Sequence, residues 1–191
     1  MANIDAPNGF RPVKHRSGMP WNGSATRYVI PATDATASFV GDAVKLAGTS
    51  DSSGKVPGCI QAATGDRVVG VIAAMEPDFD NLTLLYRTAS TERFVYVIDD
   101  PSVLFEIQDD GVGATLAATD IGLNANFIVG SGNTTTGASG MELDTNTKAT
   151  TNTLDLKIHS ITHTPRNELA ANVQVLVSFN KHQFADQVAG V

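Results

Sequence analysis

The stretch ERFVYVIDDPSVLFEIQ, residues 92–108, is the most informative guide to the fold class. Residues 93–98 alternate between two faces, and the same alternation returns at residues 103–108, as in two β-strands. Pro101, which lies between the two runs, presets a turn torsion, and the aspartates before it can hydrogen-bond the turn backbone. The stretch therefore predicts a β-hairpin. Each strand mixes apolar and polar residues on both faces, which predicts neighbours on both sides.

The chain beyond residue 27 consists of short β-rich runs separated by turn clusters. The runs predicted as further strands are residues 28–31, 39–46 (two short strands broken at Gly41-Asp42), 67–75, 82–86, 127–129, 153–162 and 172–179. Residues 76–80 predict a turn, residues 114–119 a single helical turn or a strand, and the Gly/Thr-rich residues 130–148 a long loop. No long stretch has a strong helical period. We therefore predict a mainly β, compact antiparallel β-sandwich or barrel-like domain with little helix.

Residues 1–27 differ in composition from the rest of the chain. Three prolines and three glycines exclude a helix or a central strand. The same residues include Phe10, Val13 and the single tryptophan, Trp21, types that disordered tails usually lack. Four basic residues and one acidic residue give them a charge of +3, which leaves −10 for the remainder of a chain with net charge −7. We predict an extended N-terminal arm that orders against another protein surface, followed by a β domain over residues 28–191. A mobile terminus is the alternative.

Composition and charge narrow the possible partners. Charged residues make up 17% of the chain, below the roughly 25% typical of soluble domains, and an acidic chain lacks the basic footprint of a nucleic-acid-binding protein. No apolar run approaches the ~18 residues that cross a bilayer, and the first residues lack the pattern of a signal peptide. The single cysteine, Cys59, permits no internal disulfide. We expect no direct nucleic acid partner, no membrane partner, and a soluble protein that folds in a reducing cytoplasm.

Residue types that could support catalysis or bind a metal are scattered. On one strand, His159 and His163 would lie ~13 Å apart, too far to share an ion, while His159 with His182 across strands stays open. Two aspartate pairs lie at turns and lack the ligand pattern of a calcium loop. The Gly/Ser segments lack the spacing of a nucleophile elbow, and Cys59 has no histidine near it in sequence. We predict no catalytic residue, no cofactor site and no metal ligand, and therefore a chain that is not an enzyme.

Several segments resemble virion structural proteins of tailed bacteriophages. In chain order they are residues 5–12 (DAPNGFRP), 21–23 (WNG), 39–45 (FVGDAVK), 100–108 (DPSVLFEIQ), 120–126 (DIGLNAN), 136–143 (TGASGMEL), 166–168 (RNE) and 177–184 (VSFNKHQF). Among such proteins the chain is most similar to capsid decoration, or cement, proteins. One departure is Asn8, which stands where a bulkier apolar residue is expected.

The resemblance implies a compact β domain with an extended arm, which binds the outer face of a phage head and stabilises contacts between capsomers. The implied partners are the major capsid protein and further copies of this chain, as a homotrimer or, alternatively, a dimer. The implied location is the capsid exterior, after synthesis in the cytoplasm of a bacterial host. The arm residues expected at the interface are Phe10, Arg11, Pro12, Val13, Lys14 and Trp21. The alternatives are a head–tail connector or tail component, and a host enzyme or binding module.

Overall fold

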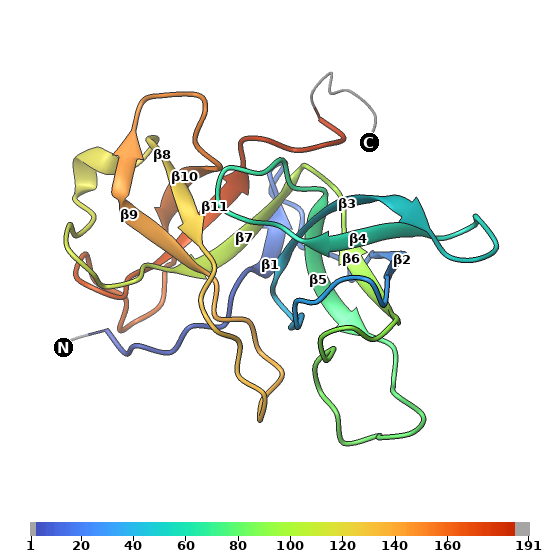
Figure 1. Ribbon diagram of the computed structural model, residues 1–191. Coiled ribbons are helices and arrows are strands. Elements are labelled where there is room, and N and C mark those ends of the chain that lie inside the picture. The colour runs from blue at the N-terminus through green and yellow to red at the C-terminus, as the bar shows by residue number, and fades with distance from the viewer. Residues whose placement is uncertain (1–2, 186–191) are drawn as a thin grey trace.

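Eleven strands and one 3₁₀ turn (Ala118–Asp120) make up the regular structure in the computed structural model, which describes residues 3–185 (Figure 1). One sheet has six strands, in the order β1 (Arg11–His15), β7 (Val103–Gln108), β11 (Gln174–Phe179), β10 (Leu156–Ile161), β8 (Asn124–Ile128) and β9 (Glu142–Ala149). The other is a closed barrel, in the order β2 (Thr26–Ile30), β4 (Pro57–Gln61), β3 (Ala43–Ser50), β5 (Gly70–Met75) and β6 (Arg93–Ile98).

Antiparallel pairing dominates both sheets, and β2 with β4 is the parallel exception among the described strands. The predicted mainly β, sandwich-like or barrel-like fold with little helix is therefore confirmed. Residues 1–2 of the predicted arm and residues 186–191 of the predicted β domain lie outside the described residues.

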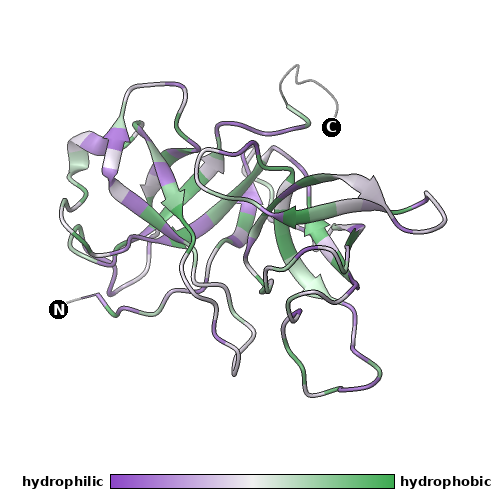
Figure 2. Ribbon diagram, in the orientation of Figure 1, coloured by the Kyte–Doolittle hydropathy of each residue, from purple (hydrophilic) through white to green (hydrophobic). Residues whose placement is uncertain are grey.

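The larger hydrophobic core contains side chains from both sheets. Phe105 and Ile107 of β7 belong to it, together with Val71 of β5 and Ile98 of β6. A smaller core fills the barrel and includes Cys59. Figure 2 shows hydrophobic residues concentrated on the strands, most evenly in the barrel. Burying a side chain of this kind stabilises the fold by roughly 1.5–3 kcal/mol, so the shared core joins the two sheets into one packed unit.

Strands β6 and β7 occupy the predicted positions but do not form the predicted hairpin. The barrel strands β2 and β5 flank β6, whereas β1 and β11 flank β7. The connection at residues 99–102 passes between the sheets. Asp99 accepts a hydrogen bond from the hydroxyl of Tyr28 in the barrel at 3.1 Å, and the Ser102 carbonyl accepts one from the Arg16 amide, just after β1, at 2.7 Å. The hairpin prediction is wrong because alternation identifies a strand without identifying its partner.

The expectation of neighbours on both sides of these strands holds for β7. All six of its residues are buried, since it lies inside the sheet between β1 and β11, with the larger core on one face.

The predicted N-terminal arm contributes a strand to the six-stranded sheet. Strand β1 lies at the edge of that sheet, paired with β7, and its register shifts between Pro12 and Lys14. An edge strand tolerates proline because the missing N–H need not face a partner. The sequence correctly excluded a central strand here, but the strands begin at Arg11 rather than near Tyr28.

Three further sequence predictions differ from the structure. Residues 82–86 form no strand, and the first of the two short strands predicted at 39–46 is only an isolated bridge at Val40, whereas the second is confirmed as the start of β3 at Ala43. The predicted loop at residues 130–148 ends in β9, which pairs with β8. Composition hid this strand, because its buried positions include a polar residue, Thr145, beside Leu143.

Four predicted strands are confirmed. They correspond to β2, β5, β10 and β11. Strands β10 and β11 pair antiparallel, with Leu156 opposite Phe179 and Ile158 opposite Val177. Leu156 and Ile158 of β10 are buried, which leaves the polar face of β10, with Lys157 and His159, outside the core.

Candidate protein-binding surface

Phe10, the first aromatic residue predicted at an interface, lies in the core. It is 1% exposed, and its ring lies 5.0 Å from that of Phe179, 5.8 Å from that of Phe127 and 6.2 Å from that of Phe105, measured between centroids. Edge-to-face pairs of this kind add to the free energy of burial. Phe10 as a partner-facing residue is therefore a wrong prediction, because the aromatic cluster already covers its surface.

The other predicted interface residues divide into two groups. Trp21 is half-buried against the larger core, and its indole N–H donates to the Ser24 carbonyl at 3.2 Å. Pro12 and Lys14 are also half-buried, while Arg11 and Val13 are exposed. Arg11 pairs with Glu106 at 3.4 Å and keeps 60% of its side chain exposed. The edge strand therefore leaves Arg11 and Val13 exposed, whereas the two aromatic residues stabilise the fold.

The connection between β5 and β6, residues 76–92, exposes large apolar side chains. Phe79 is 89% exposed, Leu82 is 73% exposed and Leu85 is 52% exposed. The connection extends away from the barrel (Figure 1). We call residues 76–92 the apolar loop. Sequence analysis predicted only a turn and a strand here, although an aromatic residue within the turn sequence Asp78–Asp80 was a signal for an exposed contact.

Arg87 holds the base of the apolar loop against the barrel. Its side chain is fully buried, and the guanidinium donates to the carbonyls of Pro31, Asp34 and Thr91 at 2.8 Å each and to that of Thr36. The Asp34 carboxylate lies 3.3 Å away and compensates its charge. A buried arginine is tolerated when its donors are satisfied in this way.

Arg93, the first residue of β6, also holds the apolar loop in place, through hydrogen bonds to the carbonyls of the loop. Its guanidinium donates to the carbonyls of Glu76 at 2.9 Å, Tyr86 at 2.6 Å and Leu84 at 3.2 Å. The start and the middle of the loop are thus tied to one side chain, and the Phe39 ring stacks on Tyr86 at 5.1 Å. A fixed base beneath exposed apolar side chains suits protein recognition, because less conformational entropy is lost on binding.

The apolar loop and the edge strand share one surface. A cavity of about 420 Å³ is lined by Arg11 and Asn8 from the N-terminal segment, by Leu85 from the apolar loop, and by Thr136 and Gly137 from the loop before β9. The Val40 amide donates to the Gly137 carbonyl at 2.9 Å, which ties the segment before β3 to the loop before β9. Arg11, predicted as an interface residue, therefore lies beside an apolar residue that sequence analysis assigned to a strand.

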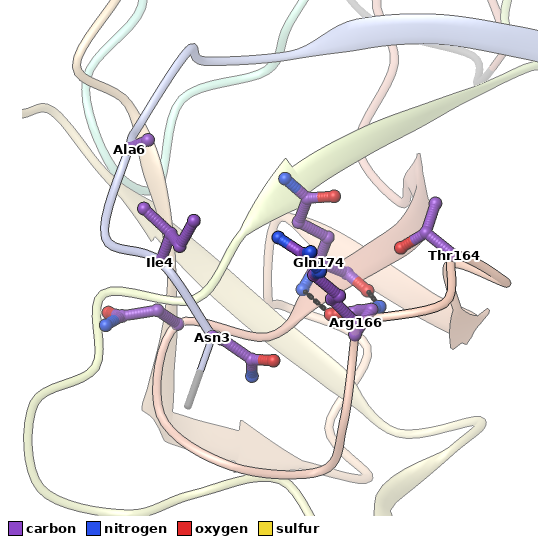
Figure 3. A pocket seen from close by; sticks show the side chains of 8 residues that line it. Asn3, Ile4, Ala6, Thr164, Arg166 and Gln174 are labelled. Carbon is purple, nitrogen blue, oxygen red and sulfur yellow. Dashed lines mark hydrogen bonds between the residues drawn. The ribbon is translucent and has the colours of Figure 1, made fainter. Parts of the chain in front are cut away.

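Figure 3 shows a second cavity, of about 290 Å³, where the N-terminal segment crosses the connection between β10 and β11. Asn3 donates to the carbonyls of Glu168 at 2.9 Å and Ala171 at 3.0 Å. Asn167 exchanges two hydrogen bonds with the backbone of Gln174, at 2.7 and 2.8 Å. The amide groups around this cavity therefore fasten the chain to itself.

The surroundings of Cys59, His159 and His182 fit a structural role rather than a catalytic one. Burial raises the pKa of the Cys59 thiol to about 12, so the thiolate needed for nucleophilic attack does not form near neutral pH. His159 Nε2 lies 2.8 Å from Ser178 Oγ, and His182 is buried. Among residues 3–185, no three His, Cys, Asp or Glu side chains are placed to hold a metal ion. No helix in the same range is long and apolar enough to cross a membrane.

Comparisons of the chain with protein-family models, curated proteins and solved structures gave no match. The surface formed by the apolar loop and Arg11 is the feature of the described residues that points most directly to a function.

Proposed function

We propose that this chain is a non-enzymatic capsid decoration protein. It binds the outer face of a tailed-phage head and stabilises contacts between capsomers of the major capsid protein. It works on the capsid exterior, after synthesis in the bacterial cytoplasm, and assembles as a homotrimer. The phage assignment rests on the sequence resemblance, and the protein-binding role rests on the exposed apolar loop.

The single observation that carries the protein-binding role is the exposure of Phe79, Leu82 and Leu85 on a loop held by buried arginines. Contiguous exposed apolar residues mark protein contact sites, and aromatic residues tend to dominate the binding free energy. Arg11 beside Leu85 adds a positive charge at the rim. A decoration protein gains from such a surface because several weak contacts on one lattice add up to strong attachment.

The proposed mechanism is mechanical. A protein that binds only the assembled shell raises the free energy needed to separate its subunits. Heads without this chain should still assemble but should lose DNA at a lower temperature than decorated heads. Bare heads, bare heads with the added chain, and native heads are compared by heat-induced DNA release. Identical release curves for all three would contradict the proposal.

A substitution at the shared cavity tests the surface itself. Leu85→Glu should weaken retention on empty heads by at least about tenfold, because it places a charge among contacts that lose water on binding. Val112→Glu is the matched control, since Val112 is 64% exposed and lies outside the apolar loop. A position at the neck or tail in a map of the virion would instead support the connector or tail role.

A further inference from the structure

A basic cavity lies on the outer face of the six-stranded sheet, away from the apolar loop. Its volume is about 490 Å³, and its lining includes Arg16, Lys157, His159, Ser178 and Phe179. Arg16 and Lys157 are exposed, while the Phe179 ring packs in the core against Phe10. The cavity therefore has a charged rim, to which Pro101 adds an apolar side chain.

The charge of this cavity is positive on a chain whose net charge is −7. Burial lowers the pKa of His159, and Arg16, Lys157 and Lys14 lower it further by their charge. The described lining contains no acidic residue. The Asp100 carboxylate, next to the lining residue Pro101, contacts His15 at 3.3 Å. An acidic group is therefore the ligand that this cavity favours.

The tip of the apolar loop has the complementary chemistry. Phe79 lies between Asp78 and Asp80; Phe79 and Asp80 are exposed, and Asp78 is half-buried. The Asp78 carboxylate accepts hydrogen bonds from the amides of Asp80 at 3.0 Å and Asn81 at 3.3 Å, so the tip is a defined turn. It presents one aromatic ring between two negative charges.

The tip and the basic cavity of one chain lie at opposite ends of β6. The apolar loop leads into β6 at Arg93, and Pro101, which lines the cavity, follows β6 after Ile98. Six residues of strand span ~20 Å. In Figure 1 the loop extends below the barrel, while the segment after β11 runs along the upper side. Contact between tip and cavity therefore requires two molecules.

We infer that the Asp78–Asp80 tip of one copy docks in the basic cavity of a second copy, with Phe79 facing Pro101 and Asp80 facing Arg16 and Lys157. This inference rests on the proposed function of the apolar loop as a protein-contact element, and it names the partner of the loop tip. The contact is head-to-tail, so repeated contacts close into a ring, here the proposed homotrimer, when the rotation permits.

Charge reversal tests the contact without changing the core. Asp80→Lys and Lys157→Glu should each weaken self-association of the purified full chain by at least about tenfold. The double variant Asp80→Lys with Lys157→Glu should recover assembly, because every reversed tip then meets a reversed cavity. Lys55→Glu is the matched control, since Lys55 is exposed on the loop between β3 and β4. Sedimentation equilibrium gives the masses.

Cross-linking tests the same contact independently of charge. The double variant Asp78→Cys with Asn180→Cys should form disulfide-linked oligomers under mild oxidation, because Asn180 lines the cavity. The native Cys59 is fully buried, so it does not form cross-links of its own. Asp78→Cys with Lys55→Cys should form far fewer such links.

The outcomes separate this inference from the proposed function. A wild-type chain that stays monomeric at all concentrations, or a double variant that does not recover assembly, overturns the inference, and head binding by such a chain leaves the decoration role intact. Oligomers that need the tip and the cavity but fail to bind empty heads support the inference and contradict the decoration role.

Discussion

Phe10 and Phe79 have similar neighbours in the sequence, but one is buried and the other is exposed in the structure. Each follows a turn-forming residue and precedes a charged one, yet Phe10 is 1% exposed and Phe79 is 89% exposed. The N-terminal segment, predicted as the partner-binding arm, supplies the core with an aromatic ring. The apolar loop, predicted as a turn and a strand, carries the exposed apolar surface.

The backbone conformation at Gly9 explains why Phe10 is buried. Its φ is +64°, and an added Cβ would lie 2.4 Å from Ser139 Cβ and 2.5 Å from the Gly41 carbonyl oxygen. Only glycine permits this close approach with this backbone conformation. The approach directs Phe10 into the aromatic cluster, and the Phe10 amide donates to the Gly41 carbonyl at 2.9 Å. The lesson is that composition identified the N-terminal segment as contact-forming, while backbone packing decided that it contacts its own chain.

The strongest test of this comparison replaces each phenylalanine with alanine. Phe10→Ala should lower the free energy of unfolding by about 3–5 kcal/mol, because it leaves a cavity among packed rings. Phe79→Ala should change it by less than about 0.5 kcal/mol. Denaturant unfolding at low protein concentration, which keeps self-association out of the measurement, gives both values. Similar losses for the two variants would contradict the assignment of Phe10 to the core.

The second test removes the support of the apolar loop. Arg87→Met should lower the free energy of unfolding by about 3 kcal/mol, because it leaves buried carbonyls and the Asp34 carboxylate without their donor. Arg11→Ala, whose ion pair with Glu106 is largely exposed, should cost less than about 1 kcal/mol. Denaturant unfolding measures the loss, and limited proteolysis should show faster cleavage within the apolar loop of Arg87→Met only. Equal stability of the two variants would show that the loop base does not depend on Arg87.

The smallest expected effect concerns the N-terminal segment where it passes β9. Burial, together with the carboxylates of Asp5, Asp110 and Asp109, raises the pKa of Glu142 to about 7, from an ordinary value of 4.5. The folded chain therefore binds this proton more tightly than the unfolded chain. Its contribution to stability is complete below about pH 4.5 and is lost as the pH rises through about 7.

Glu142→Gln removes this dependence. At pH 8 the variant should be more stable than the wild type by about 1–2 kcal/mol, a value reduced for solvent screening, and at pH 4 the two should be alike. Thermal unfolding across this pH range measures the difference, with the exposed Glu92→Gln as control. A difference in stability of the same size at every pH would indicate that Glu142 does not interact with the neighbouring carboxylates.

Much of the fold was predictable because local patterns determine local structure. Alternation located β6, β7, β10 and β11. Proline at residue 12 correctly excluded a central strand, because proline cannot donate to a ladder. The strand β9 was missed because its composition is polar. Its buried positions are covered by neighbouring segments, which the sequence pattern does not reveal.

The candidate site was only partly predictable. Arg11 and Val13 were expected at the surface and are exposed there, because charge and edge position are local properties. Phe10 was expected at the same surface and lies in the core, and the exposed Phe79 and Leu82 were assigned to a turn and a strand. Exposure depends on which segments pack together, and hydrophobicity alone does not specify that.

By itself, the sequence determined a mainly β chain, the positions of most of its strands, and a basic N-terminal segment on an acidic body. Only the tertiary structure decided that β6 and β7 belong to different sheets, that Phe10 completes an aromatic cluster, and that the apolar loop stays exposed. The physical reason is that periodicity and charge act between residues close in sequence, whereas strand pairing and burial depend on contacts between segments far apart.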